Sequence, residues 1–163
     1  PSVKSISDKI ALRKALKSGL IDFVATDHAP HDLNLKNNPY FTCPSGMPNI
    51  QHTLVAVLQL VSDGDLLIED VPRVTSHNIA TRFNIKDRGF IREGYWADIV
   101  LVDINKEQVI NNKNLEYKCG WSPFEGDKFS STVIETLVNG ESAYSNGQVS
   151  DFIRGKKLEF TRG

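Results

Sequence analysis

A helical pattern that leads almost without a break into a short apolar run limits this chain to a mixed α/β fold. Ser5 and Ser7 precede apolar residues at helical spacing and Gly19 follows them, which predicts a helix of about three turns. Residues 21–26 (IDFVAT) come next and are rich in strand-forming residues. A parallel strand covered by helices on both faces has this composition. A helix followed directly by such a strand is half of an α/β unit.

Residues 27–48 form a segment that holds four of the seven prolines, with Asn, Asp, Ser and Gly between them. We expect a loop of about 20 residues, and loops of that length in a compact domain are usually functional or disordered. A helix is expected to follow Asn49 as its cap, because the apolar residues of 50–61 recur at helical spacing. A weaker helical stretch is expected at 66–83, where Pro72 limits one segment.

Glycines punctuate short β-rich runs over the C-terminal half of the chain. Asn139-Gly140 lies between two of these runs and predicts a hairpin, because a type I′ turn needs a positive φ at both central residues. We therefore expect residues 1–86 to be an α/β part and residues 87–163 to be a small all-β domain of the sandwich type. The expected strands are Asp98–Asp103, Gln108–Ile110, Thr132–Val138 and Glu141–Tyr144.

Composition and charge exclude several classes of function. The chain is 40% hydrophobic and 24% charged, no apolar run approaches the ~20 residues of a membrane-spanning helix, and no signal-peptide pattern opens it. Its net charge is −1 and its basic residues are scattered, which argues against a nucleic-acid partner. Cys43 and Cys119 form no C-x-x-C pair, which favours a reducing compartment. We expect a cytoplasmic protein that acts on a small molecule and binds neither nucleic acid nor membrane.

A carboxylate and two imidazoles directly follow the expected strand, in Asp27-His28-Ala29-Pro30-His31. The active sites of α/β barrels are built at the C-terminal ends of their strands, and Asp and His are suited to metal ligation and to proton transfer near neutral pH. The same pattern also fits an Asp27 that caps the loop backbone and two histidines in ordinary surface hydrogen bonds. The residues alone leave both interpretations open.

The segment IDFVATDHAPH closely resembles the signature of dihydroorotases, in the cyclic amidohydrolase branch of the amidohydrolase superfamily. The likeness continues in order along essentially the whole chain. It includes residues 1–4 as the tail of the N-P-P/S-L-R segment, Ser45–Pro48 in the place of the G-I/M-P/V-G substrate loop, residues 89–103 (GFIREGYWADIVLVD) and 118–126 (KCGWSPFEG) as β-domain segments, and residues 138–140 (VNG) as the closing hairpin.

This resemblance implies the C-terminal part of a metal-dependent (β/α)8 barrel, namely its last strand and helices, followed by a β-domain. It implies zinc, as one or two ions, and the reversible hydrolysis of dihydroorotate to N-carbamoyl-aspartate in pyrimidine synthesis. Asp27 matches the catalytic base that also contacts the metal, His31 matches the residue that binds the substrate carboxylate, and His28 is expected to form a hydrogen bond behind them. Backbone groups of Pro44, Ser45 and Gly46 are expected to hydrogen-bond the pyrimidine ring.

The chain departs from the family pattern mainly in what it lacks. The family's remaining metal ligands, an H-x-H pair, a carboxylated lysine and two histidines, would lie upstream of Pro1. A (β/α)8 barrel needs about 250 residues, so we expect this chain to be an incomplete fragment that is inactive alone. His52 and His77 are not expected to replace the ligands: His52 should be partly exposed or hydrogen-bonded behind the site, and His77 should be structural.

Two alternatives remain beside dihydroorotase. A related cyclic amidohydrolase, such as an allantoinase or a hydantoinase, more often carries a different residue where His31 stands. A non-catalytic scaffold for another pyrimidine enzyme has no physical need of Asp27 and His31. The resemblance also implies a homo-oligomer and leaves open an association with another enzyme of the same pathway.

Overall fold

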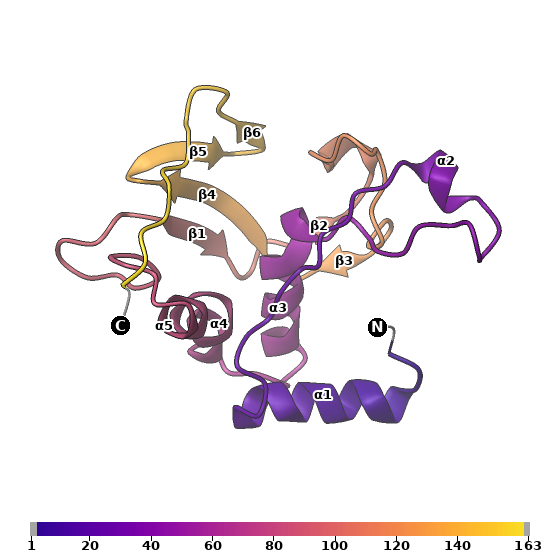
Figure 1. Ribbon diagram of the computed structural model, residues 1–163, viewed down its shortest axis with the longest axis horizontal. Coiled ribbons are helices and arrows are strands. Elements are labelled where there is room, and N and C mark those ends of the chain that lie inside the picture. The colour runs from indigo at the N-terminus through magenta and orange to yellow at the C-terminus, as the bar shows by residue number, and fades with distance from the viewer. Residues whose placement is uncertain (1–2, 162–163) are drawn as a thin grey trace. The chain divides into compact units, whose positions relative to one another are not determined.

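The computed structural model describes residues 3–161, which form two compact units that are each built from separate stretches of the chain (Figure 1). The first unit takes in the chain up to Val24, Leu60–Val102 and the chain from Val133 on, and the second takes in Ala25–Gln59 and Asp103–Thr132. The expected division into residues 1–86 and 87–163 stays a prediction.

The first helix, α1 (Ile6–Ser18), has the bounds that the sequence predicts. The Ser5 hydroxyl accepts the Asp8 backbone N–H at 3.1 Å, and the Asp8 carboxylate accepts the Ser5 N–H, which together form a capping box. Gly19 ends the helix at φ +79°, a left-handed conformation that glycine adopts without strain. Leu16 is buried, whereas Ile10 is 47% exposed, so much of the apolar stripe faces outward.

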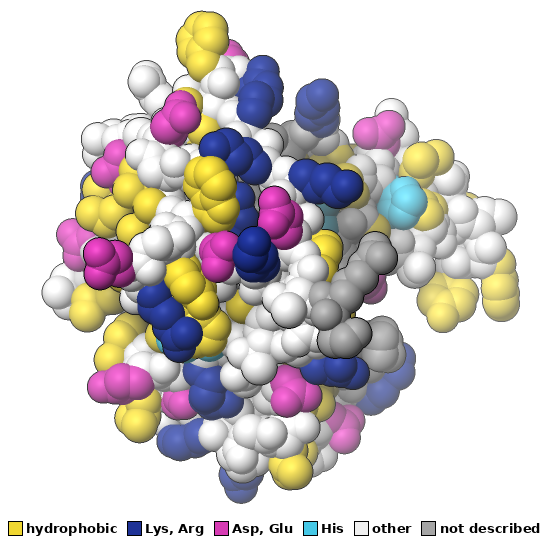
Figure 2. Space-filling model, turned by 60° about the vertical axis from the view of Figure 1, so that its left-hand side comes forward, with side chains coloured by type: hydrophobic (Ala, Val, Ile, Leu, Met, Phe, Trp, Pro, Cys, Tyr) yellow, Lys and Arg dark blue, Asp and Glu magenta, His cyan; other side chains and the backbone are white. Residues whose placement is uncertain are grey.

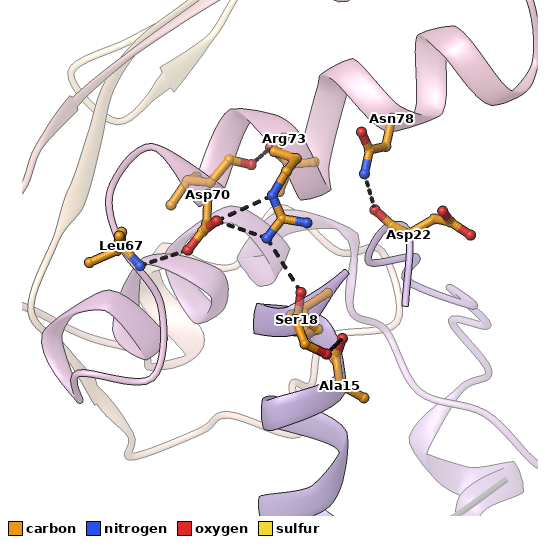
Figure 3. Close-up of polar contacts among 10 residues, drawn as sticks. Ala15, Ser18, Asp22, Leu67, Asp70, Arg73 and Asn78 are labelled. Atoms are coloured by element: carbon orange, nitrogen blue, oxygen red, sulfur yellow. Dashed lines mark hydrogen bonds and ion pairs between the residues drawn. The ribbon is translucent and has the colours of Figure 1, made fainter. Parts of the chain in front are cut away.

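The predicted helical stretch 66–83 is confirmed over Asp70–Arg82, with a π-helical turn in its middle. An ion pair lies at the start of this stretch: the Arg73 guanidinium donates to the Asp70 carboxylate at 2.8 and 3.2 Å (Figure 3). The same guanidinium donates to the Leu16 carbonyl at 3.4 Å. The backbone N–H of Leu67 and then the Arg73 side chain lower the pKa of Asp70. The segments are α4 (Asp70–Pro72), the π-helix Arg73–His77 and α5 (Asn78–Arg82).

The predicted strand at residues 21–26 is wrong as an element. The Val24 N–H donates to the Val74 carbonyl of the π-helix at 3.0 Å. The Asn78 side-chain amide donates to the Asp22 carbonyl at 2.7 Å, as Figure 3 shows. A strand needs a neighbouring strand that shares a hydrogen-bonded ladder, and within residues 3–161 no strand pairs with this segment. The apolar pattern therefore marked a real packing segment whose backbone partners are helical.

The strands predicted for the C-terminal half are confirmed. Asn139 and Gly140 form the hairpin turn with φ of +54° and +87°, as a type I′ turn requires. One sheet has the strand order β1-β4-β5-β6, and β2 pairs with β3, which the sequence pattern did not indicate. The bounds are β1 (Ile99–Asp103), β2 (Gln108–Val109), β3 (Lys128–Phe129), β4 (Thr132–Val138), β5 (Glu141–Ser145) and β6 (Gln148–Val149) (Figure 1).

Each unit has its own buried apolar residues. In the first unit they are Leu16, Leu66, Val71, Val74 and Ala80, and in the second Val55, Val57, Leu58, Ile110 and Phe129. On the face drawn in Figure 2, basic and acidic side chains are interspersed among apolar ones. No helix within residues 3–161 has the length and apolar character that crossing a membrane requires.

Candidate active site

The structure places the motif Asp27–His31 beside the predicted substrate loop. His28 and Met47 form a parallel β-bridge, and the Ala29 N–H donates to the Met47 carbonyl at 3.0 Å. Gly46 lies at φ +97°, and a Cβ on it would lie 2.5 Å from the Ala29 Cβ, so both its conformation and this close approach require glycine. Two segments about 15 residues apart in the sequence are therefore neighbours in the second unit.

Asp27 stands at the mouth of this loop with its side chain exposed. Its φ of +44° is left-handed, a conformation that Asp and Asn tolerate better than most residues because their short polar side chains can hydrogen-bond locally. The predicted catalytic carboxylate is thus accessible to solvent and to a ligand.

His28 binds the backbone at the start of the next helix. Its Nδ1 accepts the backbone N–H groups of Asn49 at 3.1 Å and of Ile50 at 3.3 Å. These hydrogen bonds assign the proton of the neutral ring to Nε2. The sequence predicted that the Asn49 side chain caps the helix, and this prediction is wrong. The side-chain amide of Asn49 instead donates to the Thr26 carbonyl at 3.1 Å. The helix is a 3-10 turn (Ile50–His52) that continues as α3 (Thr53–Ser62).

His52 is buried, with 3% of its surface exposed. Of the two expectations for this side chain, partial exposure is therefore wrong, and a hydrogen-bonding position behind the site stays a prediction. It lies on the 3-10 turn ahead of α3, where the helical spacing used for the prediction does not hold. Its Nδ1 is 3.4 Å from both the Tyr117 hydroxyl and the Ser122 Oγ. Burial lowers the pKa of His52 and raises that of Tyr117. His52 is therefore a neutral, packed side chain near pH 7.

Tyr117 joins the two histidines and was not identified from the sequence. Its ring centroid is 5.5 Å from that of His28 and 5.7 Å from that of His52. Its hydroxyl accepts the Gln51 N–H at 2.9 Å. The His28 and Tyr117 side chains together accept the N–H groups of residues 49–51 at the start of the helix. N–H groups at the start of a helix have no partner within the helix.

Acid should destabilise the chain through His52. Because its pKa is lowered on folding, the unfolded state binds a proton below pH 6.5 that the folded state does not. The free energy of unfolding should therefore fall as the pH drops from about 6.5 toward the lowered pKa, by at most about 1.4 kcal/mol per pH unit. Urea unfolding of the wild type and of His52→Gln at a series of pH values measures this. A difference between the two proteins that is independent of pH in this window would contradict it.

His31 is half-buried, and its backbone is held on both sides. Its N–H donates to the Ala29 carbonyl at 2.9 Å, and its own carbonyl accepts the Trp121 indole N–H at 2.8 Å. Trp121 belongs to the segment 118–126, whose resemblance to the family was the sequence signal that could have pointed to it.

Lys36 lies at the end of α2 (Leu33–Lys36), and its ammonium group contacts the substrate loop. It was not identified from the sequence, because nothing in the local pattern sets it apart.

Among residues 3–161, which the structure describes, no three or more His, Cys, Asp or Glu side chains are grouped so that they could hold a metal ion. Catalytic zinc usually takes three protein ligands, and Asp27 offers one carboxylate. The Nδ1 of His28 is already occupied by two N–H groups. The chain therefore supplies at most part of a ligand set.

Comparison with known proteins places the chain in a family. The model of the amidohydrolase family matches residues 2–143. A dihydroorotase of Halobacterium salinarum is 37% identical over 152 residues, 93% of this chain and 36% of that protein. An allantoinase of Desulfitobacterium hafniense is 31% identical over 159 residues, 97% of this chain and 35% of that protein. The structure of a D-hydantoinase (dihydropyrimidinase) from Thermus sp. matches 92% of this chain and 34% of its own, at 28% identity and a TM-score of 0.86.

The matched structure confirms the predicted fold class, the α/β fold of part of an amidohydrolase barrel with β-strands following it. The chain spans about a third of the length of the curated relatives it matches. Taken with the match over 2–143 and the placement of Asp27–His31 beside residues 44–46, these similarities show that the chain belongs to the amidohydrolase family.

Proposed function

We propose that this chain is the C-terminal third of a zinc-dependent dihydroorotase, which hydrolyses the ring amide of dihydroorotate to N-carbamoyl-aspartate and catalyses the reverse closure. The observation that carries the proposal is the contact between two segments: the parallel bridge at His28 sets Asp27 and His31 beside Pro44–Gly46. A catalytic carboxylate, a candidate carboxylate-binding imidazole and a loop with accessible backbone thus share one neighbourhood in the second unit.

Asp27 is the proposed base and acid of the reaction. Hydrolysis of a cyclic amide forms a bond from water oxygen to the carbonyl carbon and breaks the ring C–N bond, so one proton must leave the water and one must reach the departing nitrogen. The exposed Asp27 carboxylate can take the first proton and deliver it to the nitrogen. Zinc, when bound in the whole enzyme, would lower the pKa of water and polarise the carbonyl, and Asp27 is the residue of this chain that would contact it.

His31 is the proposed partner of the substrate carboxylate. The hydrogen bonds of its backbone N–H and carbonyl fix the position of the His31 main chain. The imidazole ring therefore has fewer positions available to it. A hydrogen bond from imidazole to a carboxylate is charge-assisted and therefore stronger than one between neutral groups. With this assignment, the second histidine of D-H-x-x-H binds the carboxylate of the substrate. A substrate without a carboxylate would give this histidine no such role.

The similarity to an allantoinase and to a D-hydantoinase favours a second candidate, another cyclic amidohydrolase that acts on a ring without a carboxylate. A scaffold subunit without activity is a third, and the accessible Asp27 argues against it. A homo-oligomer in the cytoplasm remains our expectation for the whole protein under any of these candidates.

Ring opening by the full-length protein tests the proposal. We expect turnover of dihydroorotate with added zinc, and none of allantoin or hydantoin at comparable rates, whereas the 163-residue chain alone should be inactive. In the full-length protein, His31→Ala should raise the KM for dihydroorotate by about 10- to 100-fold, because a hydrogen bond to a charged group contributes about 1.5–3 kcal/mol.

His77→Ala is the matched control, since His77 stacks on Phe90 at 4.4 Å between ring centroids and should leave KM unchanged. Turnover of hydantoin or allantoin in place of dihydroorotate would favour the second candidate. No turnover of any ring by the zinc-loaded protein would favour the scaffold. An unchanged KM in His31→Ala would remove His31 from the substrate site.

A further inference from the structure

We propose that Lys36 is a positioning residue that holds the substrate loop Pro44–Gly46 in its binding geometry. The effect of Lys36 on the loop is inferred from contacts within the second unit. Its effect on substrate binding rests in addition on the proposed function. No motif of the sequence pointed to this lysine, and it lies outside the segment Asp27–His31.

The Lys36 ammonium group bridges two carbonyls of the loop. Its Nζ donates to the Pro44 carbonyl at 2.7 Å and to the Gly46 carbonyl at 3.1 Å. The Cys43 thiol lies 3.4 Å from the Lys36 carbonyl, so the two segments meet through backbone as well as side chain. An ammonium has three donors, and two of them are spent on residues that flank Ser45.

A second contact holds the same loop at Gly46, where a Cβ would lie 2.5 Å from the Ala29 Cβ, and the Ala29 N–H donates to the neighbouring Met47 carbonyl at 3.0 Å. The loop is therefore held both by the ammonium of Lys36 and by the chain at Ala29. A loop with one contact alone could turn its peptide groups, and the second contact reduces that freedom.

This arrangement leaves the backbone of Ser45 for a ligand. The carbonyls of Pro44 and Gly46 face Lys36, whereas Ser45 is exposed and, among the hydrogen bonds of residues 3–161, none involves its N–H or carbonyl. An amide ring presents both N–H and C=O groups at its edge, and the N–H and C=O of Ser45 are the complementary donor and acceptor. The Pro44 carbonyl and the Ser45 N–H belong to one peptide group, so Lys36 determines where the N–H donor of Ser45 points.

Alkylation of Cys43 in the 163-residue chain tests the first half of the proposal without any activity. In Lys36→Met the loop loses its tie, so iodoacetamide should modify Cys43 several-fold faster, as peptide mass spectrometry will show. The rate at Cys119, which lies outside the loop, should stay constant and serves as an internal control. Faster alkylation of Cys43 with a constant rate at Cys119 would report a local increase in the exposure of the Cys43 thiol.

Lys86→Met is the matched control variant, since Lys86 pairs with Asp87 and Glu159 on the surface of the other unit. It should leave the Cys43 rate at the wild-type value. An unchanged Cys43 rate in Lys36→Met would overturn the proposal.

The KM of the full-length enzyme tests the second half. Lys36→Met should raise the KM for dihydroorotate several-fold while kcat changes little, and Lys36→Arg, which keeps the charge and the donors, should restore most of the affinity. Faster Cys43 alkylation with an unchanged KM would overturn the link between loop and substrate. If the full-length wild type opens no dihydroorotate at all, the proposed function fails while the alkylation result still decides whether Lys36 holds the loop.

Discussion

Asp27→Asn should lower the turnover number of the full-length enzyme by about 10²- to 10⁴-fold, the range that a positioned acid–base group contributes. The amide has nearly the shape of the carboxylate but cannot take a proton from water. Asn also tolerates the left-handed φ of +44° that this position has, so the backbone should not be strained. Steady-state ring opening of dihydroorotate, with the zinc content measured on the same sample, reports the loss, and most of the metal should remain bound.

Asp32→Asn provides a matched control for this experiment. Asp32 is an exposed carboxylate in the same loop, at the start of α2, and its side chain makes no capping hydrogen bond. The control should retain the wild-type turnover number. If Asp27→Asn also kept a near-normal turnover number, Asp27 would not be the base, and the resemblance of D-H-x-x-H to the family motif would not carry its chemistry here.

Most of the elements could be predicted because their signals are local. Ser5 with Asp8 and the terminal Gly19 specify both ends of α1 within a few residues of each end. Asn139-Gly140 specifies a hairpin turn, because few residue pairs adopt a positive φ twice in succession. Residues 21–26 show the limit of this reasoning. Their composition is that of a strand, but only a neighbouring strand can make them one, and the backbone partner of Val24 is Val74, which belongs to a helix.

The candidate site divides in the same way. Asp27, His28 and His31 could be identified because their chemistry and spacing appear in one short motif. The contacts of Tyr117 and Trp121 with the site could not be predicted, because each is a hydrogen bond with a residue more than 60 positions away. Such bonds pair a side chain with a backbone group, and every residue has a backbone, so they leave no pattern of matched residue types in the sequence.

Arg88→Met should reduce the free energy of unfolding by about 1.5–3 kcal/mol, the contribution of hydrogen bonds to a charged group. The Arg88 side chain is 10% exposed and binds the Asp98 carboxylate, which is 35% exposed. It also donates to the Asn139 side-chain oxygen at 2.7 Å, and its guanidinium carbon lies 5.4 Å from the centroid of the Trp96 ring. The Asp98 carboxylate in turn accepts the Asn139 N–H at 2.8 Å.

This network links sequence features that lie far apart in the chain. Arg88 precedes the run GFIREGYWADIVLVD, Asp98 lies within it, and Asn139 begins the hairpin turn. Removing the guanidinium leaves the Asn139 oxygen without its donor and the Asp98 charge without its counter-charge. The hairpin between β4 and β5 should therefore loosen first, because its turn depends on both of these groups.

Urea unfolding of the 163-residue chain measures the loss, and Arg92→Met is the control. Arg92 is also an arginine beside an aromatic ring, with its guanidinium carbon 4.3 Å from the centroid of Phe90, but it is exposed. Its replacement should cost at most about 1 kcal/mol, because exposed contacts of this kind contribute about 0.5–1 kcal/mol. Asp98→Asn and the double variant complete a cycle, in which the second substitution should cost much less once Arg88 is gone. Equal losses for Arg88→Met and Arg92→Met would mean that burial adds nothing to the pair, and that the hairpin is held by its backbone turn alone.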